Sequence, residues 1–337
     1  MFNLYKTIFL MSTMIGTLIS ISSYSWFSMW IGLEINLLSI IPLMSSTKNA
    51  MASEAALKYF IAQALASTIL LFSINLLSIN AMYNLDYKLY LNLILNTSLL
   101  TKMGAAPFHF WFPEVMEGLN WMNCMILLTW QKFAPMVLLM YSSSTILYLS
   151  MIIIISMMIS GIMGLNQVSL RKILAYSSIN HIGWMLSSLM FVETIWLYYF
   201  LIYAMISFNI IIVFKMLNIF YLKQLFLSMN NNSMVKFFFI LNFLSLGGLP
   251  PFLGFLPKWL TIQLMIENNF YSMAVIMTIL TLMTLYFYMR ITFSTILLSM
   301  NELPYYASQK INNKLLFTSN FIALFSLIMC TLLFNFL

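Results

Sequence analysis

Apolar segments long enough to cross a lipid bilayer follow one another along almost the whole chain. Of its 337 residues, 62% are hydrophobic and only 7% are charged, whereas a water-soluble domain carries about 25% charged residues. A membrane-spanning helix needs about 20 apolar residues and satisfies its backbone hydrogen bonds internally. Spanning strands would instead appear as alternating segments of about 10 residues. The sequence therefore predicts an all-α polytopic membrane protein.

Hydropathy and the polar loops between the apolar segments predict about eleven membrane-spanning helices. The first apolar segment lacks a small-residue cleavage site, so we expect it to be a helix of the protein and not a signal peptide. The expected helices cover residues 4–22, 26–44, 54–79, 89–112, 121–141, 146–164, 170–190, 193–220, 236–265, 270–298 and 315–336.

Two of these expected helices are interrupted by glycine and proline. The first interruption lies in LLTKMGAAPFHFWFPE, residues 99–114, and the second lies five helices later in FLSLGGLPPFLGFLPKW, residues 243–259. Because five is odd, equivalent helices of the two halves would run in opposite directions, as in an inverted-topology repeat. We expect a single transmembrane domain with one repeat at 1–142, the inverted repeat at 143–300 and an extra C-terminal helix in 301–337.

Basic residues gather in the loops on one side of the predicted membrane. By the positive-inside bias, this places the N-terminus on the cytoplasm-equivalent side, and an odd number of helices places the C-terminus on the other side. The net charge of +7 is then mostly a signal of topology, and we expect no binding to nucleic acid. The basic residues on that side are Lys6, Lys48, Arg171, Lys172, Lys223, Lys236, Lys310 and Lys314, against Lys88 on the opposite side.

Four charged residues lie well inside expected helices: Glu34, Lys102, Lys132 and Lys258. A charge at the centre of a membrane helix costs on the order of 2.5–3.5 kcal/mol, and such residues by default mark proton or ion pathways. A buried lysine can exchange its proton, whereas arginine is effectively always charged. These four residues are therefore candidates for a proton relay. The alternative is that they are structural, for example as an ion pair between Glu34 and Lys102.

Two histidines also lie within the expected helices. His181 sits mid-membrane among serine and asparagine residues, and His109 follows Lys102 by seven residues. Histidine is well suited to proton relay, but either ring could instead form a hydrogen bond between helices. Glu54 and Lys58 are four residues apart near a helix start, a spacing that favours a local ion pair.

The cysteine and histidine content predicts no metal site and no redox centre in this chain. Cys124 and Cys330 are the only cysteines, and His109 and His181 are the only histidines. An iron–sulfur cluster takes about four thiolates. No iron–sulfur cluster therefore fits this chain, and the spacing of the two histidines does not support a bis-histidine haem.

Five motifs carry a resemblance to a known family: GLEINLLS, GAAPFHFWFPE, TWQKFAP, LRKILAYSSINHIGWM and LGGLPPFLGFLPKW. They resemble the chain 2 family of mitochondrial NADH:ubiquinone oxidoreductase, respiratory complex I, and most closely its insect members. The resemblance implies an antiporter-like membrane-arm subunit that contributes to proton translocation coupled to electron transfer from NADH to ubiquinone. It also implies that the chain begins at the equivalent of the fourth helix of the general family.

The resemblance assigns roles to the same buried residues. It implies that Glu34 pairs with Lys102 on the first broken helix, and that Lys132 and Lys258 continue a buried hydrophilic axis. His181 would lie in the region that connects the half-channels. Two alternatives remain open: a stand-alone cation/proton antiporter, and a structural scaffold subunit of the membrane.

The resemblance also implies a cellular setting. NADH, FMN, iron–sulfur clusters and ubiquinone would be bound elsewhere in the complex, and this polypeptide itself would bind no flavin, iron–sulfur cluster or quinone. Expected partners are other membrane-arm subunits, including antiporter-like and small mitochondrially encoded chains, together with accessory subunits and lipids such as cardiolipin. The chain would cross the mitochondrial inner membrane several times, with its N-terminus in the matrix and its C-terminus in the intermembrane space.

Overall fold

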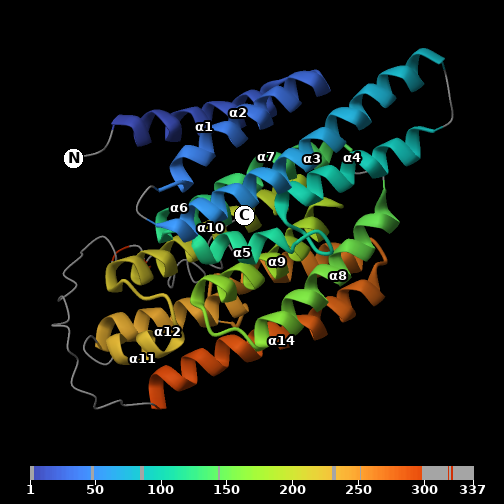
Figure 1. Cartoon of the computed structure of the whole chain (residues 1–337). Coiled ribbons are helices and arrows are strands. Elements are labelled where there is room, and N and C mark those ends of the chain that lie inside the picture. Colours follow the sequence, from blue (N-terminus) through green and yellow to red (C-terminus); the bar gives the residue numbers. More distant parts are fainter. Residues whose placement is uncertain are drawn as a thin grey trace. The chain divides into compact units, whose positions relative to one another are not determined.

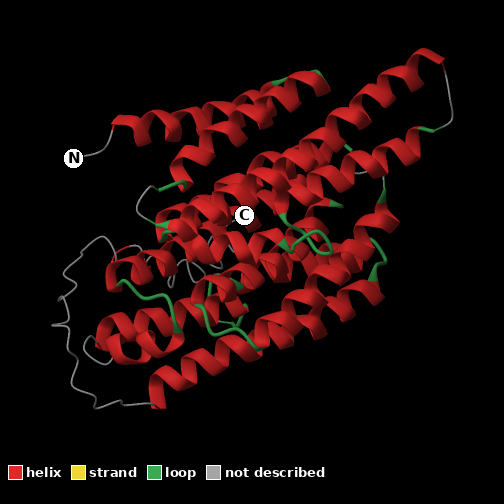
Figure 2. Ribbon diagram, in the orientation of Figure 1, coloured by secondary structure: helices red, strands yellow, loops and turns green. Residues whose placement is uncertain are grey.

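Helices make up nearly all of the chain that the structure, a computed structural model, describes (Figures 1 and 2). The described residues are 4–46, 49–83, 87–142, 145–229, 233–250, 252–297, 318, 320 and 321. Within these ranges, the only pairing of strand type is an isolated bridge between Ser169 and Tyr221. The prediction of an all-α fold is confirmed.

The chain divides into two compact units, residues 1–156 and residues 157–337. The helices that lie within the first unit are α1 (Leu4–Ser22), α2 (Trp26–Met44), α3 (Ala50–Tyr83), α4 (Lys88–Met103), α5 (Trp111–Gly118), α6 (Trp121–Leu128) and α7 (Trp130–Tyr141). Helix α8 (Ile146–Leu165) passes the boundary between the units. The second unit continues with α9 (Leu170–Leu189), α10 (Glu193–Leu217), α11 (Leu222–Met229), α12 (Ser233–Gly247), α13 (Phe255–Glu267) and α14 (Tyr271–Leu297).

Seven helices in the described part of the chain are long and apolar enough to cross a membrane. They are Leu4–Ser22, Trp26–Met44, Ala50–Tyr83, Trp121–Tyr141, Ile146–Leu165, Glu193–Leu217 and Tyr271–Leu297. The count of about eleven stays a prediction. The expected helix 315–336 lies outside the described residues apart from positions 318, 320 and 321, as do Lys48, Lys310, Lys314 and Cys330.

Two features of the helices differ from the sequence prediction. Residues 121–141 form two helices, α6 and α7, that meet at Thr129. A short helix, α11, lies in a stretch that we expected to be a loop. The Gln224 side chain explains its start, because its Oε1 accepts hydrogen bonds from the backbone N–H groups of Phe220 and Tyr221 at 2.9 and 3.2 Å. Side-chain capping of this kind satisfies backbone donors that a helix start leaves unpaired.

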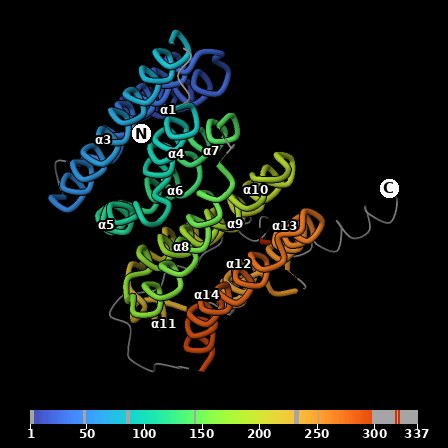
Figure 3. The backbone as a smooth tube through the Cα atoms, turned by 90° about the vertical axis from the view of Figure 1, so that its right-hand side faces the viewer, coloured from blue at the N-terminus to red at the C-terminus, as the bar shows by residue number. Residues whose placement is uncertain are grey.

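The helices of each unit pack around its interrupted helix (Figure 3). In the first unit, α3 lies along α4 and α5, while α7 contacts both α1 and α4. In the second unit, α14 lies along α12 and α13, while α10 contacts α9, α12 and α13. Both interrupted helices, α4–α5 and α12–α13, are thus held inside their own unit by several other helices.

The α1–α2 hairpin depends on two glycines that bring the helix backbones into contact. A Cβ added at Gly32 would lie 2.5 Å from the Ser20 backbone nitrogen and 2.8 Å from the Gly16 carbonyl oxygen. A Cβ added at Gly16 would in turn lie 2.8 Å from the backbone nitrogen of Asn36. Small residues of this kind allow close helix packing in membranes, where burial of apolar surface drives little association. The contact fixes α2, which carries Glu34.

We expect Gly32→Val to separate α1 from α2, because the atoms that it meets belong to the rigid backbone. Overpacking of this kind costs about 1–3 kcal/mol. The midpoint of thermal unfolding of the purified chain in detergent should fall, and Ile31→Val, a change at the neighbouring partly exposed residue, should leave it nearly unchanged. Equal midpoints for the two variants would contradict the packing assignment.

Candidate functional site

The first predicted helix break is confirmed, and it lies between α4 and α5. Helix α4 ends at Met103, and Gly104 follows in the left-handed conformation, with φ 74° and ψ 32°. Its N–H group bonds to the carbonyl oxygens of Leu100 and Thr101, as is usual for a glycine that ends a helix. The indole of Trp111, the first residue of α5, donates to the Thr101 carbonyl at 3.1 Å. The two half-helices are therefore joined by side-chain as well as backbone contacts.

Lys102 occupies the last turn of α4 and is buried, with 6% of its surface exposed. Among the described residues, no oxygen accepts a hydrogen bond from its ammonium group. Its position is favourable for a positive charge, because the carbonyl groups at a helix C-terminus carry partial negative charge. Lys102 also lines a cavity of about 10 Å³. It is thus a buried cation at the end of a helix, next to a small polar space.

Glu34 lies in α2, half-buried, and its charge interacts with that of Lys102. Within the described residues, its buried Oε1 has no hydrogen-bond partner. The structural ion pair that the sequence left open is not formed, because the charged atoms of Glu34 and Lys102 are more than 4.0 Å apart. The two groups are therefore electrostatic neighbours that are not locked together.

Lys132, in α7, is almost completely buried, with 1% of its surface exposed. Its Nζ lies 5.4 Å from the centre of the Phe112 ring, which belongs to α5. This is the geometry of a cation–π contact. The break at Thr129, three residues earlier, was missed by the sequence analysis, although Pro135 within the same apolar run was a possible signal for an irregular helix.

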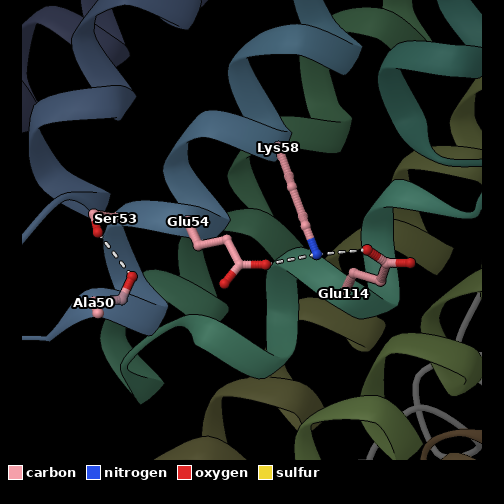
Figure 4. A network of polar contacts seen from close by, with 5 residues as sticks. All are labelled: Ala50, Ser53, Glu54, Lys58 and Glu114. Atoms are coloured by element: carbon pink, nitrogen blue, oxygen red, sulfur yellow. Dashed lines mark hydrogen bonds and ion pairs between the residues drawn. The ribbon is translucent and has the colours of Figure 1, made fainter.

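An ion-pair cluster connects the start of α3 to α5 (Figure 4). Lys58 Nζ lies 3.0 Å from Glu54 Oε1, which confirms the predicted local pair, and 2.9 Å from Glu114 Oε2. All three side chains are exposed, at 43% for Lys58, 59% for Glu54 and 56% for Glu114. Water screens the charges of exposed pairs, so such pairs add little to stability. The cluster therefore ties the second half of the broken helix to α3 only weakly, and it differs clearly from the buried charges.

The second predicted break is also confirmed, and it lies between α12 and α13. Helix α12 ends at Gly247, and Gly248 has a positive φ of 77°. Lys258, in the first turns of α13, reaches back to this end: its Nζ donates to the carbonyl oxygen of Gly247 at 2.8 Å and to that of Leu246 at 3.4 Å. The ammonium group thus caps α12, with only 7% of Lys258 exposed.

His181 belongs to α9, in which every residue from 173 to 189 is buried. Its Nδ1 forms a hydrogen bond of 2.9 Å with the hydroxyl of Tyr199, and its ring centre lies 4.9 Å from that of Tyr203. Trp184 follows on the same helix, and its ring centre lies 5.9 Å from Lys258 Nζ. Helix α9 therefore carries both His181 and the aromatic contact of Lys258.

The predicted site residues thus fall into two groups, one in each unit. Glu34, Lys102 and Lys132 lie in the first unit, and His181 and Lys258 lie in the second. His109 is buried in the segment between α4 and α5, where it interacts with the backbone of Pro107. In the described ranges, no three His, Cys, Asp or Glu side chains are grouped so that they could hold a metal ion.

Comparisons with known proteins find similar chains over almost the whole sequence. The family model described as NADH:quinone oxidoreductase/Mrp antiporter, TM, matches residues 23–284. The chain is 47% identical to NADH-ubiquinone oxidoreductase chain 2 of Locusta migratoria, over 92% of this chain and 91% of the relative. It is 48% identical to the protein of the same name from Anopheles gambiae, over 98% of both. A chain of respiratory complex I from Thermus thermophilus has a similar fold, with a TM-score of 0.83 and 22% identity, over 99% of this chain and 79% of that one.

The two glycines at the second break provide a matched pair of substitutions. A Cβ at Gly248 would lie 2.7 Å from Cδ and 2.8 Å from Nζ of Lys258, and the left-handed backbone costs another ~1–2 kcal/mol for a residue with a Cβ. A Cβ at Gly247 would meet nothing closer than 3.7 Å. We expect Gly248→Ala to displace Lys258 from the α12 carbonyls and to lower the thermal unfolding midpoint. Gly247→Ala should leave the midpoint close to that of the wild type, and equal losses would contradict the role of Gly248.

Proposed function

The chain belongs to the NADH:quinone oxidoreductase/Mrp antiporter family as an antiporter-like membrane subunit of respiratory complex I, and we propose that it moves protons through the buried charged residues of its two units. Complex I is a proton-translocating oxidoreductase. We propose that this chain contributes to the translocation and that NADH, FMN, iron–sulfur clusters and ubiquinone are bound by other parts of the complex.

One observation supports this proposal most strongly: in each unit, a buried lysine stands at the end of a broken helix. Lys102 lies in the last turn of α4, and Lys258 donates to the last carbonyl groups of α12. Interrupted helices in membrane transporters place helix ends at membrane depth, where they stabilise a charged substrate or ion. A lysine at such a position can hold a proton without a permanent counter-ion and can later release it.

Charge coupling provides the step from one group to the next. A negative Glu34 attracts the protonated form of Lys102, and within the low-dielectric interior such interactions are much stronger than in water. Because the two groups are not locked in an ion pair, a change in the charge of one changes the proton affinity of the other. We propose that Glu34, Lys102 and Lys132 work in this way in the first unit, and His181 and Lys258 in the second.

The setting follows from the family. The chain is a multi-pass membrane protein, and its animal relatives imply the mitochondrial inner membrane. We propose that the N-terminus faces the matrix and the C-terminus faces the intermembrane space. We further propose contacts with other antiporter-like chains, with small mitochondrially encoded chains, with accessory subunits and with cardiolipin.

The proposal is tested by neutral substitutions in the assembled complex. We expect Lys102→Met and Glu34→Gln to lower the number of protons pumped per NADH oxidised, because each removes one charge of the coupled pair. The measurement is proton uptake by proteoliposomes that contain the complex, recorded together with NADH oxidation. Lys58→Met is the control, since it removes an exposed lysine of the same charge.

Two other functions predict different results. If the chain were only a scaffold, both variants would assemble and pump with the wild-type ratio of protons to NADH. If the chain were a stand-alone cation/proton antiporter, the purified single chain in liposomes would exchange protons for cations without the rest of the complex. Either result would contradict the proposed role of the buried residues in complex I.

A further inference from the structure

The cavity next to Lys102 has polar walls that the proton relay does not explain. It has a volume of about 10 Å³, which is about the volume needed to hold one water molecule. Apart from Lys102, its polar lining residues are Asn36, Tyr59, Gln63 and Gln131, and Leu33, Leu37 and Pro135 complete the wall. All of these residues lie within the first unit. A purely structural core would fill such a space with apolar side chains.

Two side-chain amides face each other at this cavity. Asn36 Nδ2 donates to Gln131 Oε1 at 3.1 Å, and Gln131 Nε2 donates to Asn36 Oδ1 at 2.8 Å. The two amides therefore exchange both of their hydrogen bonds, which fixes their relative orientation. Asn36 lies in α2 two residues after Glu34, and Gln131 lies in α7 directly before Lys132. The amide pair thus joins α2 and α7, the helices that carry Glu34 and Lys132.

Tyr59 adds a hydroxyl to the same group. It is buried, with 2% of its surface exposed, and its hydroxyl donates to Gln131 Oε1 at 3.3 Å. That oxygen therefore accepts from both Asn36 and Tyr59. A hydroxyl can also accept hydrogen bonds, which neither an ammonium nor an amide NH₂ group can do. Tyr59 therefore leaves accepting capacity at the cavity wall.

Lys102 contributes hydrogen-bond donors that need an acceptor. An ammonium group has three N–H donors, and in the described part of the chain none of them has an acceptor. Gln63, which also lines the cavity, donates from Nε2 to the Lys102 carbonyl oxygen at 3.2 Å and ties α3 to the end of α4. A polar cavity of this size can hold a water molecule that satisfies such groups. A water molecule between Lys102 and Tyr59 would give one of the three N–H donors an acceptor.

We propose that Asn36, Tyr59 and Gln131 form a binding site for a single water molecule that solvates the ammonium group of Lys102. Tyr59 supplies the hydroxyl that contacts the water, and the Asn36–Gln131 pair holds Gln131 Oε1 in place for Tyr59. All three are positioning residues that act on Lys102 through the water. The inference rests on the proposed function of Lys102, and it adds the group that solvates this lysine while it holds its proton.

A first experiment examines the water itself. Cryo-electron microscopy of the assembled complex, at a resolution that shows ordered water, should reveal one water molecule within hydrogen-bond distance of Lys102 Nζ and Tyr59 Oη. Tyr59→Phe keeps the ring and removes the hydroxyl, so the water density should disappear. Tyr90→Phe, at an exposed tyrosine of α4, should leave it in place. A wild-type cavity without water density would overturn the proposal.

A second experiment examines proton pumping in proteoliposomes. Tyr59→Phe and Gln131→Met should each lower the pumping rate about five-fold, the effect of about one lost hydrogen bond, while the complex assembles normally. The double variant Asn36→Leu with Gln131→Met should lower the pumping rate no more than either substitution alone, because each substitution already breaks the same amide pair. The exchanged pair, Asn36→Gln with Gln131→Asn, keeps both amides and the summed side-chain length, and it should recover most of the rate.

The results separate this inference from the proposed function. If Lys102→Met lowers pumping while Tyr59→Phe and Gln131→Met pump at the wild-type rate, the water site is wrong and the role of Lys102 stands. If Lys102→Met itself leaves pumping unchanged, both proposals fail. A failure of the exchanged pair to recover would show that the two amides matter only for packing, which would also overturn the inference.

Discussion

A charge at membrane depth has to be stabilised by something other than bulk water, and in this chain the ends of interrupted helices do this. A helix that stops inside the membrane exposes carbonyl groups with partial negative charge. Lys102 belongs to the last turn of α4, so it lies at the end of its own helix. Lys258 belongs to α13 and donates to the last carbonyl groups of another helix, α12. The breaks and the buried lysines are therefore parts of the same arrangement.

The two lysines nevertheless differ in how firmly they are held. Lys258 has two carbonyl partners, and Gly248 is the residue that leaves room for it. Lys102 has no acceptor among the described residues, but it has a nearby acid, Glu34, and a polar cavity. A group whose partners are a separate charge and a water-sized space changes its protonation with little rearrangement of the backbone. Lys258, by contrast, leaves two carbonyl groups without a donor whenever it moves away.

The sequence predicts the parts of this arrangement that depend on local chemistry. Glycine and proline within apolar runs located both breaks, and the cost of burying charge identified Lys102 and Lys258. The contacts made by side chains distant in sequence could not be predicted in this way. Asn36 and Gln131 are 95 residues apart, and nothing in either segment indicates that two amides face each other. The extra break at Thr129 was missed because no glycine or proline stands at that position, and Pro135, the nearest proline, lies six residues later.

The first break also links the surroundings of Lys102 and Lys132, which lie 30 residues apart in the sequence. Gly104 ends α4 directly after Lys102 and Met103, and a Cβ at this position would lie 3.2 Å from the Cβ of Phe112. The Phe112 ring in turn faces the ammonium group of Lys132. The left-handed turn at Gly104 therefore sets the position of the lysine before it and of the aromatic ring that contacts the next lysine. Because one tight turn fixes both surroundings, a movement of α5 relative to α4 would change the environments of Lys102 and Lys132 together. Such a shared turn is a direct physical route for coupling Lys102 to Lys132, the two lysines that we propose to carry protons in this unit.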